Sequence, residues 1–145
     1  MPSWRATSVG ASSVRLIGAS ALKPLRRPQL WLGLWWTAVM LVLVSSLMPL
    51  PPIDAPRGSD KLVHLLSYGA LALGAVQLFA TRAALLRTGI GLVLLGAGLE
   101  LAQSAWTSTR MLDPRDALAN TFGVLLGLAS AATPLRDLLL RFDRG

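Results

Sequence analysis

The chain has 145 residues, of which 53% are hydrophobic and 14% are charged, and its mean hydropathy is +0.56. Soluble domains usually contain about 25% charged residues, so this composition predicts one membrane domain rather than a soluble enzyme. The absence of cysteine excludes disulfides, thiolate catalysis and cysteine-based metal sites. We interpret the net charge of +7 from the positions of the basic residues along the chain.

The first 29 residues form a basic segment. Residues 1–29 contain no Asp or Glu and carry several Ser and Arg residues. We expect this segment to be cytoplasmic and poorly ordered, and to be held near an anionic membrane surface by its positive charge. The same composition also suits a mitochondrial transit peptide, so that alternative stays open.

Four hydrophobic spans lie within residues 30–133, which we interpret as the membrane domain. Each span has roughly 17–20 residues, which is enough to cross about 30 Å of hydrocarbon as a helix, and none alternates as a strand would. The sequence therefore predicts an all-α membrane protein, a bundle of four transmembrane helices. The spans cover about residues 30–48, 62–80, 88–105 and 117–133, with residues 81–87 joining the second span to the third.

The last segment, residues 134–145, is predicted to be a short amphipathic helix on the cytoplasmic membrane surface. Its apolar side chains recur at helical spacing and share one face. These residues are Leu135, Leu138, Leu139 and Phe142.

Basic residues are divided unevenly between the two sides of the membrane that this topology creates. Ten Lys and Arg residues fall on the side of the termini and of the second connection, and four fall on the other side. Short loops rich in Lys and Arg stay in the cytoplasm, so both termini of this multi-pass protein are predicted to be cytoplasmic. Because topology accounts for the positive charge, we expect membrane lipids as partners and no nucleic acid.

Polar residues near the start of the second span form one helical stripe. Asp60, His64 and Tyr68 are spaced by four residues, and Lys61 lies beside them. Ser59 is expected to be the N-cap of this helix. A capped helix with an interfacial His and Tyr would explain the stripe without any function.

Glu100 interrupts an otherwise apolar run in the third span. A carboxylate at membrane depth is costly, and it persists where it is paired, lines a polar cavity or carries function. Gln103 shares its helical face at a spacing of three residues. The structural alternative is an ion pair of Glu100 with Arg110 or Lys61.

The fourth helix is expected to open with Asp113 as its N-cap and Asp116 in its first turn. Asn120 follows Asp116 by one turn, and Gly123 and Gly127 continue the stripe. Small residues at this spacing allow helices to approach closely in lipid. The sequence leaves open whether they pack within the chain or against a second copy in a homo-oligomer.

Taken in order, these three groups of residues resemble the VanZ-like family of bacterial membrane proteins. The resemblance covers about residues 54–131 and implies a small, multi-pass helical protein of the cell inner (cytoplasmic) membrane. It also implies a link to the cell envelope, because the namesake contributes to resistance against the glycopeptide teicoplanin. It supplies no reaction. The polar positions of the family correspond here to Asp60, Lys61, His64, Tyr68, Glu100, Gln103, Arg110, Asp113, Asp116 and Asn120.

Three classes of function fit these residues. The first is a site at the outer membrane face that binds or converts a lipid-linked or cell-wall molecule. Glu100 or His64 would act there as acid or base, and Lys61 and Arg110 would bind an anionic group. The other binding candidates are Asp60, Tyr68, Gln103, Asp113, Asp116 and Asn120. The second class is a non-catalytic membrane protein whose polar cluster ties the helices together.

The third class is a metal-dependent site. His64 with Asp60, Glu100, Asp113 and Asp116 could hold a hard cation such as Mg²⁺ or Ca²⁺. No fixed metal-ligand spacing supports this interpretation, so the sequence by itself predicts no metal and no cofactor.

Overall fold

The computed structural model of the chain describes residues 21–48, 59–106 and 114–144, and this part of the chain is helical apart from short connections and one isolated bridge between Leu22 and Phe79. Three helices are long and apolar enough to cross a membrane, and a fourth span is reached if α4 and the bent segment after it are counted together. The elements are α1 (Pro28–Leu47), α2 (Ser59–Leu78), α3 (Arg82–Trp106), α4 (Pro114–Ala129), the 3₁₀ turns η1 (Ser130–Ala132) and η2 (Pro134–Asp137), and α5 (Leu138–Arg144).

The helix boundaries differ from the predicted spans mainly at charged ends. The predicted connection 81–87 is wrong, because α3 already begins at Arg82. Thr81 caps this helix, since its hydroxyl accepts a hydrogen bond from the Ala84 backbone N–H at 3.2 Å. The hydropathy pattern ends the apolar span at Arg87 because charged residues count against a membrane helix. In the structure the helix continues past this residue, since a long basic side chain near a helix end can extend toward the membrane surface.

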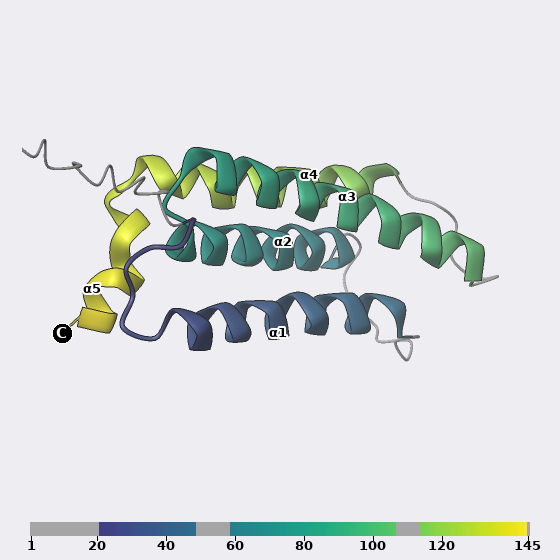
Figure 1. Ribbon diagram of the computed structural model, residues 1–145. Helices are drawn as coiled ribbons and strands as arrows, with labels where there is room; N and C mark the ends of the chain where they lie inside the picture. Colours follow the sequence, from purple (N-terminus) through teal and green to yellow (C-terminus); the bar gives the residue numbers. More distant parts are fainter. Residues whose placement is uncertain (1–20, 49–58, 107–113, 145) are drawn as a thin grey trace, which may run out of the picture.

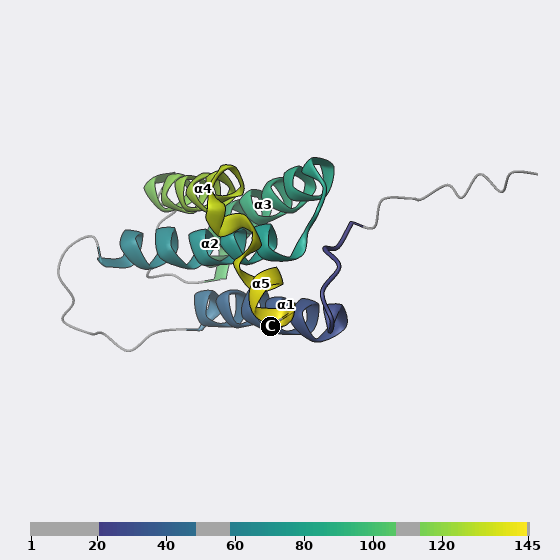
Figure 2. The same cartoon turned by 90° about the vertical axis from the view of Figure 1, so that its left-hand side faces the viewer.

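Helix α2 is the centre of the bundle, with α1 on one side and the α3–α4 pair on the other (Figures 1 and 2). Tyr68, Ala72 and Val76 of α2 are almost completely buried. By contrast, Val39 is the one residue of α1 that is buried in the described structure. Helix α1 is held partly by Trp35, whose indole N–H donates to the Leu71 carbonyl at 2.9 Å.

The closest helix contact in the bundle joins α2 to α4 through small residues. A Cβ added at Gly127 would come within 2.6 Å of the Ala72 Cβ and 2.8 Å of the Leu73 backbone nitrogen. A Cβ added at Gly123 would meet the Leu65 carbonyl and the Gly69 backbone nitrogen. The small-residue stripe of the fourth helix is therefore used within the chain.

Large apolar side chains cover the outside of the bundle. A soluble protein would bury most of them, whereas a lipid bilayer solvates them. The exposed ones include Leu34, Trp36, Met40, Leu41, Leu62, Leu66, Leu86, Ile90, Leu94, Phe122, Leu125 and Leu126.

The segment before α1 and the end of α2 are joined by backbone hydrogen bonds. The Lys23 N–H donates to the Leu78 carbonyl, and the Ala80 N–H donates to the Ala21 carbonyl, both at 2.8 Å. The Lys23 side chain is only 4% exposed, and its ammonium group lies 2.8 Å from Asp137 Oδ1. We call this end of the bundle, where α2 and α4 finish, the tail end.

The C-terminal helix α5 also lies at the tail end, after a bend of 83° (Figure 1). The Trp31 indole N–H donates to Asp143 Oδ1 at 2.8 Å, and the Arg26 backbone N–H donates to the other oxygen. The Lys23 ammonium holds the pKa of Asp137 below its ordinary value, and the Trp31 hydrogen bond does the same for the pKa of Asp143. The described chain thus begins and ends at the same end of the bundle.

Candidate functional site

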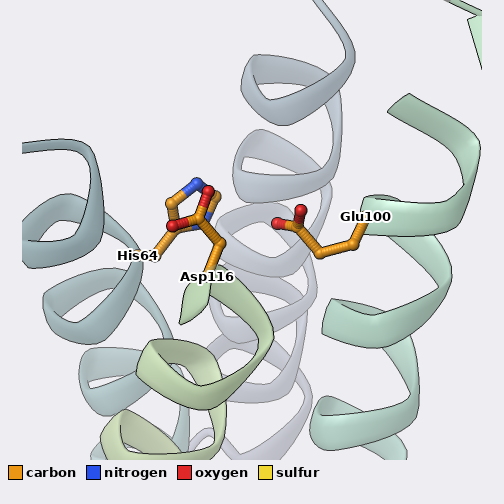
Figure 3. Close-up of side chains that lie close together, drawn as sticks. All are labelled: His64, Glu100 and Asp116. Atoms are coloured by element: carbon orange, nitrogen blue, oxygen red, sulfur yellow. The ribbon is translucent and has the colours of Figure 1, made fainter. Parts of the chain in front are cut away.

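Polar side chains from three helices converge at the opposite end of the bundle, which we call the site end. Here α2 and α4 begin and α3 finishes. His64 of α2, Glu100 of α3 and Asp116 of α4 form the polar cluster, whose donor atoms all lie within 4.8 Å of one another (Figure 3). Glu100 is 7% exposed, and the other two residues are half-buried.

Helix direction explains why these three side chains meet. Side chains on a helix lean toward its N-terminus. His64 and Asp116 therefore lean toward the site end, where α2 and α4 begin. Glu100 leans the other way, toward the tail end, because α3 runs in the opposite direction. In Figure 3 the Glu100 carboxylate points across the gap at His64 and Asp116.

Lys61 lies at the edge of the polar cluster and joins two helices. Its ammonium nitrogen is 3.1 Å from Asp116 Oδ1 on α4 and 3.3 Å from Asp60 Oδ2 in its own helix. Asp116 Oδ1 receives no hydrogen bond of good geometry from the described residues, so its contact with Lys61 is an ion pair. The Asp60 side chain is 54% exposed and lies outside the cluster.

A second polar layer lies one helical turn deeper, below His64 and Asp116. Tyr68 and Asn120 make up this layer and are 1% and 2% exposed. Both approach Gly96 on α3: a Cβ there would come within 3.0 Å of Asn120 Nδ2 and 3.3 Å of Tyr68 Cε1. Because Gly96 precedes Glu100 by one turn, the layer lies directly beneath the cluster.

Two polar atoms of this deeper layer are buried without a partner. Among the residues that the structure describes, neither the Tyr68 hydroxyl nor Asn120 Oδ1 has a hydrogen-bond partner. Leaving such a group unsatisfied costs about 1–3 kcal/mol. The layer therefore offers one hydroxyl and one carbonyl oxygen to a ligand or to water in the polar cluster above.

Gln103 has a different environment. It is 6% exposed, and its amide donates to the Ser46 carbonyl near the end of α1. This bond ties α3 to α1 at the site end, so Gln103 has at least one structural role.

The structure brings most of the predicted site residues together. Six of them lie in the polar cluster, in the deeper layer or beside them, and Asp60 lies at the exposed edge. Arg110 and Asp113 fall outside the described residues. The six are Lys61, His64, Tyr68, Glu100, Asp116 and Asn120.

Two groups near the site, Gly96 and the carbonyl of Ser46, were not predicted from the sequence. A signal existed for Gly96, since it is a small residue one turn before Glu100 in an apolar helix and leaves room there for neighbouring polar side chains. No sequence signal could identify Ser46, because its backbone carbonyl is the group that takes part.

No protein-family model, curated protein or solved structure matches this chain. An imidazole beside two carboxylates can transfer protons or bind a cation, and a neighbouring ammonium group can hold an anion.

Proposed function

We propose that this protein is a VanZ-like protein of the bacterial cytoplasmic membrane, whose polar cluster at the outer face binds a lipid-linked or cell-wall molecule of the envelope. The observation that carries the proposal is the meeting of His64, Glu100 and Asp116 from three helices. These residues come from the three separate sequence groups on which the family resemblance depends. Their convergence at one end supports a shared role.

The position of the site supports the proposed class of ligand. The helices that carry the cluster have exposed apolar side chains near it, such as Leu62 of α2 and Leu118 of α4, so the lipid tail of a ligand would be solvated beside the site. Lys61 supplies a positive charge at the edge for an anionic headgroup. His64 or Glu100 would then serve as acid or base toward that headgroup.

The alternative is a non-catalytic role in which the polar groups hold the helices together. Two contacts favour it: Lys61 joins α2 to α4 through Asp116, and Gln103 joins α3 to the Ser46 carbonyl of α1. These contacts do not use the oxygen atoms of Tyr68 and Asn120, which have no partner among the described residues, and for that reason we favour a binding site.

The proposed orientation has a direct test. The tail end carries the basic residues Lys23, Arg26, Arg82 and Arg136, so we expect it to face the cytoplasm. A reporter that is active only in the cytoplasm, fused after Gly145, should be active. Activity from an export-dependent reporter at the same position would contradict the orientation.

The ligand class is tested by binding of a defined probe. Purified protein in detergent should retain undecaprenyl phosphate in native mass spectrometry in preference to phosphatidylcholine. A hydrogen bond to a charged group contributes about 1.5–3 kcal/mol, so Lys61→Gln should weaken retention by about 10-fold or more. Arg87→Gln removes a cation near the tail end and is the matched control. Equal retention by both variants, or no preference for the phosphate lipid, would contradict the proposal.

A further inference from the structure

The polar cluster brings two carboxylates and one imidazole close together. Glu100 and Asp116 hold oxygen atoms within 4.8 Å of each other. Lys61 lies beside Asp116 but also pairs with Asp60, so its charge is shared between two carboxylates at the edge of the cluster. At a spacing of about 5 Å, two like charges repel by about 3 kcal/mol at an effective dielectric constant of 20. A bound cation would remove this repulsion.

We infer that His64, Glu100 and Asp116 are the ligands of a divalent transition-metal ion of the Zn²⁺ class. The donor set favours this class. Imidazole nitrogen suits Zn²⁺ and its neighbours in the first transition row, whereas Mg²⁺ and Ca²⁺ prefer oxygen atoms alone. Three protein ligands that leave a fourth position open are also typical of zinc sites that act on a substrate.

The geometry allows the site to close on an ion. Ligand distances of about 2.0–2.2 Å in a tetrahedral site require donor atoms about 3.3–3.6 Å apart. The present spacing is at most 4.8 Å, so rotations of the Glu100 and Asp116 side chains are enough. If Asp116 turned toward a metal, Lys61 would keep Asp60 as its partner at 3.3 Å.

The deeper layer supplies independent support. Tyr68 and Asn120 are each more than nine-tenths buried, and each has an unpartnered oxygen atom among the described residues. Both side chains belong to helices that begin at the site end, so they lean toward the cluster. Groups in this position can donate to a metal ligand or accept from it, and so orient the ligand toward the ion.

The role of the ion rests on the proposed function, since a bound metal would receive a phosphate oxygen of the envelope ligand. Binding of the metal ion does not depend on the proposed function. Metal binding can therefore be measured without any added lipid. The composition makes the measurement clean, because His64 is the only histidine and the chain has no cysteine. Protein purified with a histidine-free affinity tag therefore contains one imidazole.

The first experiment uses full-length protein stripped with a chelator and titrated with Zn²⁺ alone. We expect one ion per chain by calorimetry, and excess Mg²⁺ should not displace it. In protein labelled with ¹⁵N-histidine, the single imidazole should shift on zinc addition. An unchanged imidazole signal, or no saturable binding, would overturn the inference, and this readout needs no variant.

The second experiment compares variants. His64→Gln and Asp116→Asn should each weaken zinc binding by more than about 10-fold, because losing a group that merely orients a metal ligand already costs about 10–100-fold. His64 is only half-buried, so its replacement should leave the fold intact. Asp60→Asn is the control, since it removes an exposed carboxylate of the same helix. Zinc binding that is lost in Asp60→Asn but kept in His64→Gln would overturn the assignment.

The two proposals fail separately. Zinc binding without retention of undecaprenyl phosphate would leave the metal site standing and contradict the proposed ligand. Retention of the lipid by a protein that binds no zinc would support the proposed ligand and contradict the metal site.

Discussion

Gly127→Ala should destabilise the protein by about 2–3 kcal/mol or more, although it adds a single methyl group. The added Cβ would come within 2.6 Å of the Ala72 Cβ and 2.8 Å of the Leu73 backbone nitrogen. Neither group can move by a side-chain rotation, so α2 and α4 would have to separate, and overpacking of this kind typically costs about 1–3 kcal/mol. Thermal unfolding in detergent, followed by size-exclusion chromatography, measures the effect.

Gly91→Ala is the matched control for this substitution. A Cβ at Gly91 meets no atom within 4 Å, and this residue lies in the middle of α3. Alanine is favoured over glycine by about 1 kcal/mol inside a helix, so the control should melt at the same temperature or higher. If Gly127→Ala behaved like Gly91→Ala, the close contact between α2 and α4 would not exist in the protein.

Glu100→Gln should leave the thermal stability within about 1 kcal/mol of the wild type and abolish retention of undecaprenyl phosphate. Glutamine keeps the shape of the side chain and part of its hydrogen bonding. It also removes the repulsion between Glu100 and Asp116, whose oxygen atoms lie within 4.8 Å of each other. If Glu100 served only as a structural ion-pair partner, the same change would cost about 3–5 kcal/mol.

Asp137→Asn is the control, because it should lower the thermal stability and leave the retention of lipid unchanged. It removes the carboxylate that lies 2.8 Å from Lys23, whose side chain is only 4% exposed at the tail end. We expect this variant to melt at a lower temperature and still to retain the lipid, because the site lies at the other end of the bundle. Loss of stability together with loss of lipid retention in Glu100→Gln would favour the structural alternative.

Much of the fold was predictable because a bilayer restricts what a chain can do. A membrane-spanning segment must satisfy its backbone internally, so long apolar runs can only be helices. Hydropathy therefore places α1 and α2 to within about three residues. Helix α4 begins at Pro114, directly after the expected N-cap Asp113, whereas α2 already begins at Ser59, the residue expected to be its N-cap. Hydropathy misses the start of α3 at Arg82, since it does not record that a charged side chain can sit inside a helix and still reach the surface.

The polar residues themselves were also readable from the sequence. Glu100, Asn120 and His64 stand out because a polar side chain in an apolar helix costs free energy unless it is paired, lines a polar cavity or carries function. Their separation into stripes at helical spacing identifies one face on each helix. The sequence therefore determined the helical class of the fold and named most of the polar residues that the structure brings together.

Only the tertiary structure decided which of these residues meet. The grouping of His64, Glu100 and Asp116 depends on the rotation and depth of three helices relative to one another. These quantities are set by the contact of Gly123 and Gly127 with α2 and by the space that Gly96 leaves on α3. Helical periodicity acts within one helix and carries no information about such distances. For that reason Asp60 and Asp116, similar in the sequence, end in different places, one exposed to solvent and the other inside the polar cluster.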